Sequence, residues 1–128
     1  MKFFFAPFDV RLLADNKPDD DINNVVQPDL SIVCTKEKLD DKGCNGAPDM
    51  IIEVLLPSSV KLDRWKKYQL YEKAGVNEYW LVDPVNNSVE IHLLVDAQYK
   101  FQGVFTKDDT VSVNLFPGFK LDLNQVFV

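Results

Sequence analysis

The sequence predicts a mixed α/β domain whose sheet is built in the order βββαβ and then continues in antiparallel strands. Three observations predict this fold class. The chain begins with segments that are apolar throughout or that alternate apolar and polar residues, as strands do. One segment that starts with serines and ends with a glycine, as a helix does, follows them. Only strand-like segments come after it. The 128 residues, 46% of them hydrophobic, can bury one core, so residues 1–128 are expected to form a single domain.

The first three strands are expected near residues 2–13, 25–34 and 48–56, separated by the turn-forming segments DNKPDDDIN and KLDDKGCNG. The segment SSVKLDRWKKYQLYEKAGV predicts a helix from about 59 to 74, because its serines suit a helix start and Gly75 suits its end. The later strands are EYWLVDP, SVEIHLLV, QYKFQGVF and VSVNLFPGFKLDL. The helix should cover one face of the sheet.

Composition excludes several functional classes. No stretch approaches the ~18 to 20 apolar residues of a membrane-spanning helix, and Pro7, Asp9 and Arg11 interrupt the start of the chain too early for a signal peptide. We therefore expect a cytoplasmic protein that binds no membrane. Cys34 and Cys44 match no zinc or redox spacing and are expected to be free thiols. The net charge of −6 disfavours nucleic-acid binding by bulk electrostatics, so DNA binding would need a local site or metal ions.

The most informative residue is Glu53, at the centre of the apolar run MIIEVLL. A strand of this composition is typically buried on both faces. Burying an unpartnered carboxylate costs several kcal/mol, so a cation, a metal or donated hydrogen bonds must offset the cost. We interpret Glu53 as a functional residue, the alternative being a buried ion pair with a lysine.

Asp29 is the expected neighbour of Glu53. If the second and third strands form an antiparallel pair with the turn centred on Asp41, Asp29 lies opposite Glu53 on the same face. Two carboxylates about 5 Å apart repel each other unless a cation lies between them, and Mg²⁺ or Mn²⁺ is the natural candidate. Asp49 shares this face but lies four residues, or about 13 Å, from Glu53 and is a weaker candidate.

Two alternatives remain open for this pair. A slip of one residue would place Asp29 on the other face, and Asp after Pro is also a common turn residue. His92 has no partner in the sequence and is expected at a strand surface or in the core.

The predicted helix supplies a cation. At 100° per residue, Lys67 lies near the middle of a mostly apolar stripe that also holds Asp63 and Tyr71. If the stripe packs on the sheet, Lys67 can reach the carboxylates and position or polarise an attacking water. The alternative is an exposed ion pair between Asp63 and Lys67. Arg64 and Lys66 are expected to face solvent, where they could contact phosphates.

The segments VVQPDLSIVC, GAPDMIIEVLLPSS and LDRWKKYQLYEKAGVNEYWLVDP resemble the putative restriction endonuclease family, formerly a domain of unknown function, of the PD-(D/E)XK nuclease superfamily. The likeness covers roughly residues 5 to 123. It follows a Pro-Asp strand, then Pro-Asp-x-x-x-Glu-Val-Leu, Asp-x-x-x-Lys-x-x-x-Tyr and Gly-Val-x-Glu-Tyr-Trp-x-Val-Asp-Pro. This long pattern implies a restriction-endonuclease-like fold.

The resemblance also implies roles for individual residues. Asp29 and Glu53 match the family's catalytic metal ligands for Mg²⁺ or Mn²⁺. Leu55 stands where the usual E-x-K motif has its lysine, and the helix residue Lys67 matches the lysine that replaces it. The implied activity is metal-dependent hydrolysis of phosphodiester bonds in DNA.

Two departures from the family pattern bear on this implication. Leu56 replaces the usual serine after Glu-Val-Leu, and the family's N-terminal helix and Glu-Leu-x-x-Gly segment have no counterpart. The chain is then expected to be an N-terminally truncated family member. Alternatively it is an inactive relic that binds a protein or nucleic acid, with a homodimer covering its exposed sheet.

Overall fold

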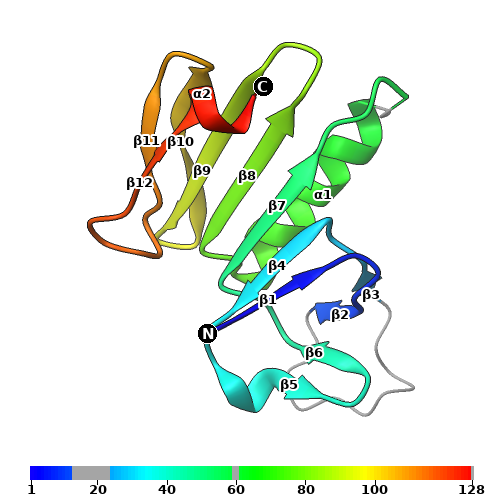
Figure 1. The fold of residues 1–128 in the computed structure, drawn as a ribbon. Helices are drawn as coiled ribbons and strands as arrows, with labels where there is room; N and C mark the ends of the chain where they lie inside the picture. Colours follow the sequence, from blue (N-terminus) through cyan, green and yellow to red (C-terminus); the bar gives the residue numbers. More distant parts are fainter. Residues whose placement is uncertain (13–23, 59–60, 128) are drawn as a thin grey trace.

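The computed structural model describes residues 1–12, 24–58 and 61–127 (Figure 1). Its principal element is a six-stranded sheet in the order β1-β4-β7-β8-β9-β10. These strands are β1 (Lys2–Phe5), β4 (Leu30–Val33), β7 (Met50–Val54), β8 (Glu78–Asp83), β9 (Ser88–Val95) and β10 (Gln98–Thr106). β7 and β8 are parallel, and the other neighbouring pairs are antiparallel. The predicted mixed sheet is confirmed.

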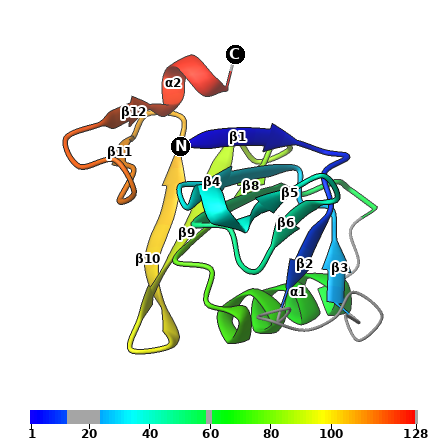
Figure 2. The same cartoon turned by 90° about the horizontal axis from the view of Figure 1, so that it is seen from below.

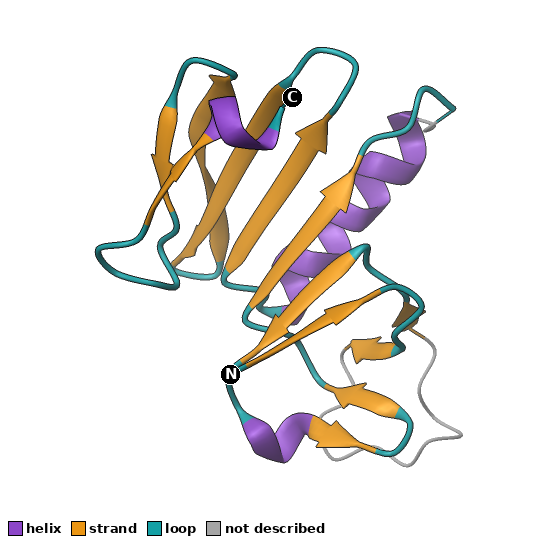
Figure 3. Ribbon diagram, viewed as in Figure 1, coloured by secondary structure: helices purple, strands orange, loops and turns teal. Residues whose placement is uncertain are grey.

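Helix α1 (Lys61–Ala74) connects β7 to β8 and lies along one face of the sheet (Figure 3). Its end is set by Gly75, whose φ of 89° suits glycine and whose N–H is bonded to the carbonyl of Tyr71. The predicted end at residue 74 is confirmed, whereas the predicted first residues, 59 and 60, lie outside the described residues. The core strands and the helix therefore follow the predicted order βββαβ.

Alternating side chains of the central strands supply two cores, one on each face. Ile51, Tyr79 and Leu81 pack with Tyr71 of α1, while Met50 and Trp80 belong to the opposite core. Figure 2 shows α1 on one side of the sheet and the C-terminal segment on the other. Burial on both faces explains why β7 and β8 are almost continuously apolar.

The two predicted N-terminal strands are each divided in the structure. Residues 2–13 contribute β1 and β2 (Val10–Leu12), and residues 25–34 contribute β4 and β3 (Asn24–Val26). Pro7 and Pro28 lie at the divisions; proline donates no backbone hydrogen bond and interrupts a ladder. The predictions of single continuous strands were therefore wrong.

β2 and β3, the halves that separate from the two predicted strands, belong to a second, four-stranded sheet in the order β3-β2-β6-β5. β5 (Leu39–Asp40) and β6 (Gly43–Asn45) form a hairpin within the segment predicted to be a loop, after a 3₁₀ turn at Lys36–Lys38. This sheet packs Val10, Leu12 and Cys44 into the core beneath α1. The other predicted loop, DNKPDDDIN, lies outside the described residues.

The C-terminal strand prediction also needs correction. Instead of one strand over residues 111–123, the chain forms β11 (Thr110–Ser112) and β12 (Lys120–Asp122), a separate two-stranded ribbon. The Pro117-Gly118 turn divides them, and α2 (Leu123–Val126) follows with Asp122 accepting a hydrogen bond from the N–H of Asn124. Val111, Val113 and Leu123 cover the sheet face opposite α1.

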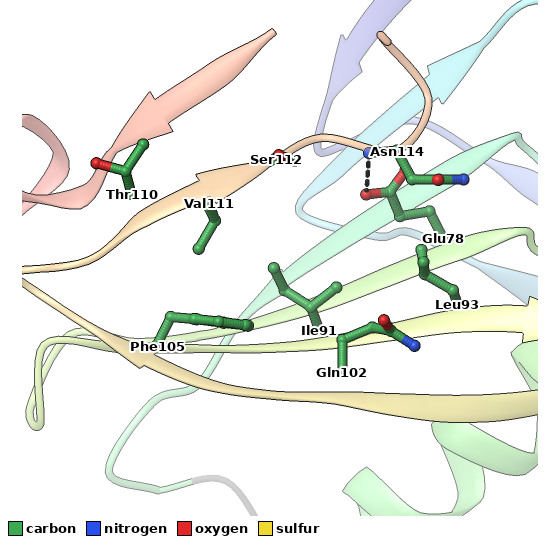
Figure 4. Close-up of a pocket in the computed structure, with 9 residues that line it drawn as sticks. All are labelled: Glu78, Ile91, Leu93, Gln102, Phe105, Thr110, Val111, Ser112 and Asn114. Carbon is green, nitrogen blue, oxygen red and sulfur yellow. Dashed lines mark hydrogen bonds between the residues drawn. The ribbon is translucent and has the colours of Figure 1, made fainter. Parts of the chain in front are cut away.

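A second buried glutamate, Glu78, holds this ribbon against the sheet. Its carboxylate accepts hydrogen bonds from the N–H groups of Asn114 and Leu115, at 3.1 and 2.9 Å, and from the indole of Trp80 at 2.9 Å. Figure 4 shows Glu78 at one end of the hollow of about 330 Å³ between β11 and the sheet. Three donors thus satisfy a side chain that is 2% exposed.

We expect Glu78→Ala to lower the free energy of unfolding by about 3 kcal/mol or more, because each buried donor left without an acceptor costs about 1–3 kcal/mol. Urea denaturation followed by circular dichroism measures the loss. Glu37→Ala, at an exposed position, is the matched control and should change stability by no more than about 0.5 kcal/mol. Equal effects of the two variants would contradict this role of Glu78.

Candidate active site

Glu53 is buried between the sheet and α1, and its side chain is held by that helix. Only 4% of the residue is exposed. Its Oε2 atom accepts hydrogen bonds from Lys67 Nζ at 2.8 Å and from Tyr71 Oη at 3.3 Å. The partner that the sequence required for this carboxylate is therefore a helix-borne ammonium, Lys67, as predicted. The same contact is also the buried ion pair with a lysine that was the alternative for Glu53.

The strand register brings Asp29 to Glu53 as predicted. Leu30 lies opposite Ile52 and Ile32 opposite Met50, and one further step places Asp29 opposite Glu53. Two reciprocal hydrogen bonds hold this step: the Asp29 N–H donates to Glu53 Oε1 at 2.8 Å, and the Val54 N–H donates to Asp29 Oδ2 at 2.7 Å. The Glu53 carboxylate thus holds the backbone at Asp29, and the Asp29 carboxylate holds the backbone directly after Glu53.

Lys67 links the buried carboxylate to solvent. Its side chain is 40% exposed, whereas that of Glu53 is 5% exposed. Burial alone would lower the pKa of Lys67, but the hydrogen bond and the charge of Glu53 outweigh burial, so the pKa is raised above its ordinary value. Within the described residues Lys67 makes its ion pair with Glu53 and none with Asp63, so the alternative of an exposed Asp63–Lys67 pair is wrong.

Tyr71, which the sequence places on the same helical stripe as Lys67 without a predicted role, is also a member of the site. It is fully buried, and burial, followed by the charge of Glu53, strongly raises the pKa of its phenol. The hydroxyl therefore stays protonated and donates to Glu53. Its position one helical turn after Lys67, on the same stripe, is the signal that could have identified it.

The remaining candidates lie outside this cluster. The Asp49 carboxylate accepts a hydrogen bond from the Cys34 N–H at 2.6 Å, and Asp63 is exposed in the first turn of α1. His92 is buried and bonded to Glu90 through Nε2, as expected for a core position. Cys34 and Cys44 are free thiols, as predicted.

The donor set fits a loosely held divalent cation. Among the described residues, no three His, Cys, Asp or Glu side chains are grouped closely enough to hold a metal ion by themselves. Asp29 is exposed, and Glu53 lies directly behind it. Mg²⁺ commonly binds one or two carboxylates and completes its shell with water and substrate phosphate, so two carboxylates at a solvent boundary match its preference.

A solved structure shares this fold. The chain resembles a crystal structure from Anabaena variabilis described as "a putative nuclease belonging to DUF820", with a TM-score of 0.72 and 22% sequence identity, covering 98% of this chain and 67% of that one. The fold is thus that of a protein described as a nuclease. The family model Uma2, "Putative restriction endonuclease", matches residues 3–124, and the chain belongs to this family.

No curated protein matches the chain at a significant level. No helix within residues 1–12, 24–58 and 61–127 has the length and apolar character needed to cross a membrane.

The ion pair predicts how stability depends on pH. Because the pKa of Lys67 is raised above 10.5, the stabilisation from Glu53–Lys67 should be fully present from neutral pH to about pH 10 and lost as the pH rises further, through the raised pKa. The difference in unfolding free energy between the wild type and Lys67→Met should therefore be constant from pH 7 to about pH 9.5. Denaturation at several pH values measures it, and a difference that vanishes below pH 9 would argue against the pair.

Proposed function

We propose that the chain is a metal-dependent DNA endonuclease that hydrolyses phosphodiester bonds at Asp29 and Glu53. The observation that carries the proposal is the position of these two carboxylates beside a helix-borne ammonium. Glu53 accepts a hydrogen bond from the Asp29 N–H, Asp29 accepts one from the Val54 N–H, and Lys67 donates to Glu53. Family membership supports the same class of reaction. A site of the PD-(D/E)XK kind, with its lysine moved from Leu55 to Lys67, would account for the contact between Lys67 and Glu53.

Asp29 and Glu53 would hold Mg²⁺ or Mn²⁺, which, when bound, supplies Lewis-acid stabilisation of charge on the phosphate. Asp29 is exposed, so DNA would reach the site from the side of this residue. Glu53 is the buried ligand, and its orientation is fixed by the Asp29 N–H, Lys67 and Tyr71. Pre-set ligands of this kind do not need to reorganise when substrate binds.

Lys67 acts in this proposal as a cation and hydrogen-bond donor. Its raised pKa keeps it protonated at neutral pH, and an ammonium has no lone pair with which to accept a proton. It can hold Glu53 and donate to the attacking water or to a phosphate oxygen, where negative charge develops. Tyr71 contacts Glu53 only and is a positioning residue.

The alternative is a catalytically inactive nuclease-fold domain that binds a partner. It is favoured by the full set of protein donors on Glu53, which satisfies the carboxylate without a metal. Calorimetry with Mn²⁺ separates the two functions. Binding that disappears in Asp29→Ala supports the nuclease, because an inactive fold has no need to retain a metal site.

The direct test is cleavage of supercoiled plasmid by the purified chain with Mg²⁺ or Mn²⁺. We expect nicking that EDTA abolishes and that falls by at least ~100-fold in Asp29→Asn and Glu53→Gln, since both changes remove a negatively charged ligand while keeping side-chain size. Asp49→Asn is the matched control and should retain activity. Nicking that survives in Glu53→Gln would refute the assignment.

Lys67→Met separates catalysis from folding. The variant keeps the apolar stem but removes the ammonium, so we expect a loss of about 1.5–3 kcal/mol in stability, the value of a hydrogen bond to a charged group. Cleavage at a temperature where the variant is folded should fall by ~100-fold or more, which corresponds to about 2.7 kcal/mol in the barrier. Lys73→Met, at an exposed lysine in the last turn of α1, is the control on the same helix. A large loss of stability with normal turnover would show that Lys67 serves only the ion pair.

A further inference from the structure

A tryptophan is exposed on α1 beside the candidate active site. Trp65 is 55% exposed although both cores of the domain are built from large apolar side chains. Its ring stacks on Tyr68, with the ring centroids 5.6 Å apart and the planes 11° from parallel. Tyr68 in turn packs edge-on against His92 and Tyr99 of the sheet. Trp65 is therefore held in a fixed orientation with one broad surface open to solvent.

This tryptophan borders a hollow of about 230 Å³ between the first half of α1 and the sheet. The helix contributes two cations and two aromatic rings, and the sheet contributes one apolar, one acidic and one imidazole side chain. The lining residues are Lys61, Arg64, Trp65, Tyr68, Leu81, Glu90 and His92. The volume lies below the ~300–1,000 Å³ of sites for drug-sized ligands, so it suits a group the size of one planar base.

The hollow adjoins the carboxylates. Leu81 in its floor is paired with Glu53 in the β7–β8 register, and neighbouring strands are about 5 Å apart. Arg64 lies one helical turn before Lys67 and also lines a second hollow, formed with residues 55–57 directly after β7. A DNA strand whose phosphate lies at Asp29 and Glu53 would therefore pass Arg64 before reaching Trp65.

Charge sets the orientation of a nucleotide in this hollow. Lys61 and Arg64 are exposed on the helix side, whereas Glu90 lies on the sheet side, where His92 Nε2 holds it at 2.9 Å. A phosphate would be attracted to the helix cations and repelled by Glu90. The base is then directed against the open face of the Trp65 ring, which is the face that Tyr68 does not cover. Because the whole chain carries a net charge of −6, DNA binding would require a local group of cations such as Lys61 and Arg64.

We propose that this hollow binds one unpaired nucleotide of the DNA strand next to the cleaved bond, with its base stacked on Trp65 and its phosphate at Lys61 and Arg64. The inference rests on the proposed nuclease function and specifies its substrate class: single-stranded or locally opened DNA. A base inside a duplex keeps its faces stacked on its neighbours, so it cannot present one to Trp65. Stacking on an aromatic ring is tolerant of sequence, because every base has such a face.

The test is binding of fluorescein-labelled oligodeoxythymidylate and of a duplex of equal length to the full chain in EDTA, where no metal-dependent cleavage occurs. Trp65→Ala should weaken single-strand binding by roughly 5- to 150-fold, the range for loss of one base–aromatic stack. Trp65→Phe should restore most of the affinity, because it keeps a flat ring. Duplex binding should change much less.

Two controls make the outcome specific. Phe119→Ala removes another exposed aromatic, which lines a hollow with Met50 and Trp80 of the core opposite α1, and should leave single-strand affinity unchanged. Intrinsic fluorescence reports on the hollow directly, since Trp80 is 2% exposed and bonded to Glu78. Quenching by oligothymidylate should therefore come from Trp65 and disappear in Trp65→Phe.

The results separate this inference from the nuclease proposal. Metal-dependent nicking together with unchanged single-strand affinity in Trp65→Ala would overturn the nucleotide site and keep the nuclease. Equal losses for single strand and duplex would also overturn it, because they would show a general contact with DNA. Stacking at Trp65 without any cleavage would support the site and overturn the nuclease.

Discussion

The structure is organised around the buried carboxylate of Glu53. A carboxylate placed between a sheet and a helix destabilises the fold unless every oxygen is satisfied. Here three donors come from two separate segments: the Asp29 N–H directly before β4, and Lys67 and Tyr71 on α1. Glu53 therefore fixes the register of β4 on β7 and the rotation of α1 on the sheet. The same contacts bring an exposed aspartate and an ammonium to one place.

Glu78 shows that burial alone does not identify a functional glutamate. It is as buried as Glu53, but two of its three donors are backbone N–H groups of one loop and the third is an indole. Within the described residues it forms no ion pair, and its role is to attach the β11–β12 ribbon to the sheet. Glu53 differs because its neighbours are a second carboxylate and a lysine that reaches solvent, and these are groups that can meet a charged substrate.

The sequence predicted the centre of the molecule better than its periphery. The continuous apolar run around Glu53, the hairpin register and the stripe of α1 each depend on short periodic patterns, and all three are found in the structure. The four-stranded sheet was missed because its strands are only two or three residues long, and two of them had been read as halves of longer strands. Glu78 gave no signal because its partners, Asn114 and Leu115, lie 36 and 37 residues away.

Helix α1 presents different faces to the core, to the Glu53 carboxylate and to solvent. Tyr71 is directed into the core, Lys67 lies at the boundary, and Trp65 and Arg64 remain outside. A chain with a net charge of −6 repels DNA at long range, so in the proposed nuclease specific contacts would have to supply the affinity over distances shorter than the ~8 Å Debye length of physiological salt. The helix concentrates those contacts, because one rigid element sets the spacing between the ammonium at Glu53 and the exposed ring of Trp65. A mutation that rotates α1 would therefore disturb the proposed metal ligands and the proposed nucleotide stacking together, whereas a change confined to its outer face would disturb the proposed stacking alone.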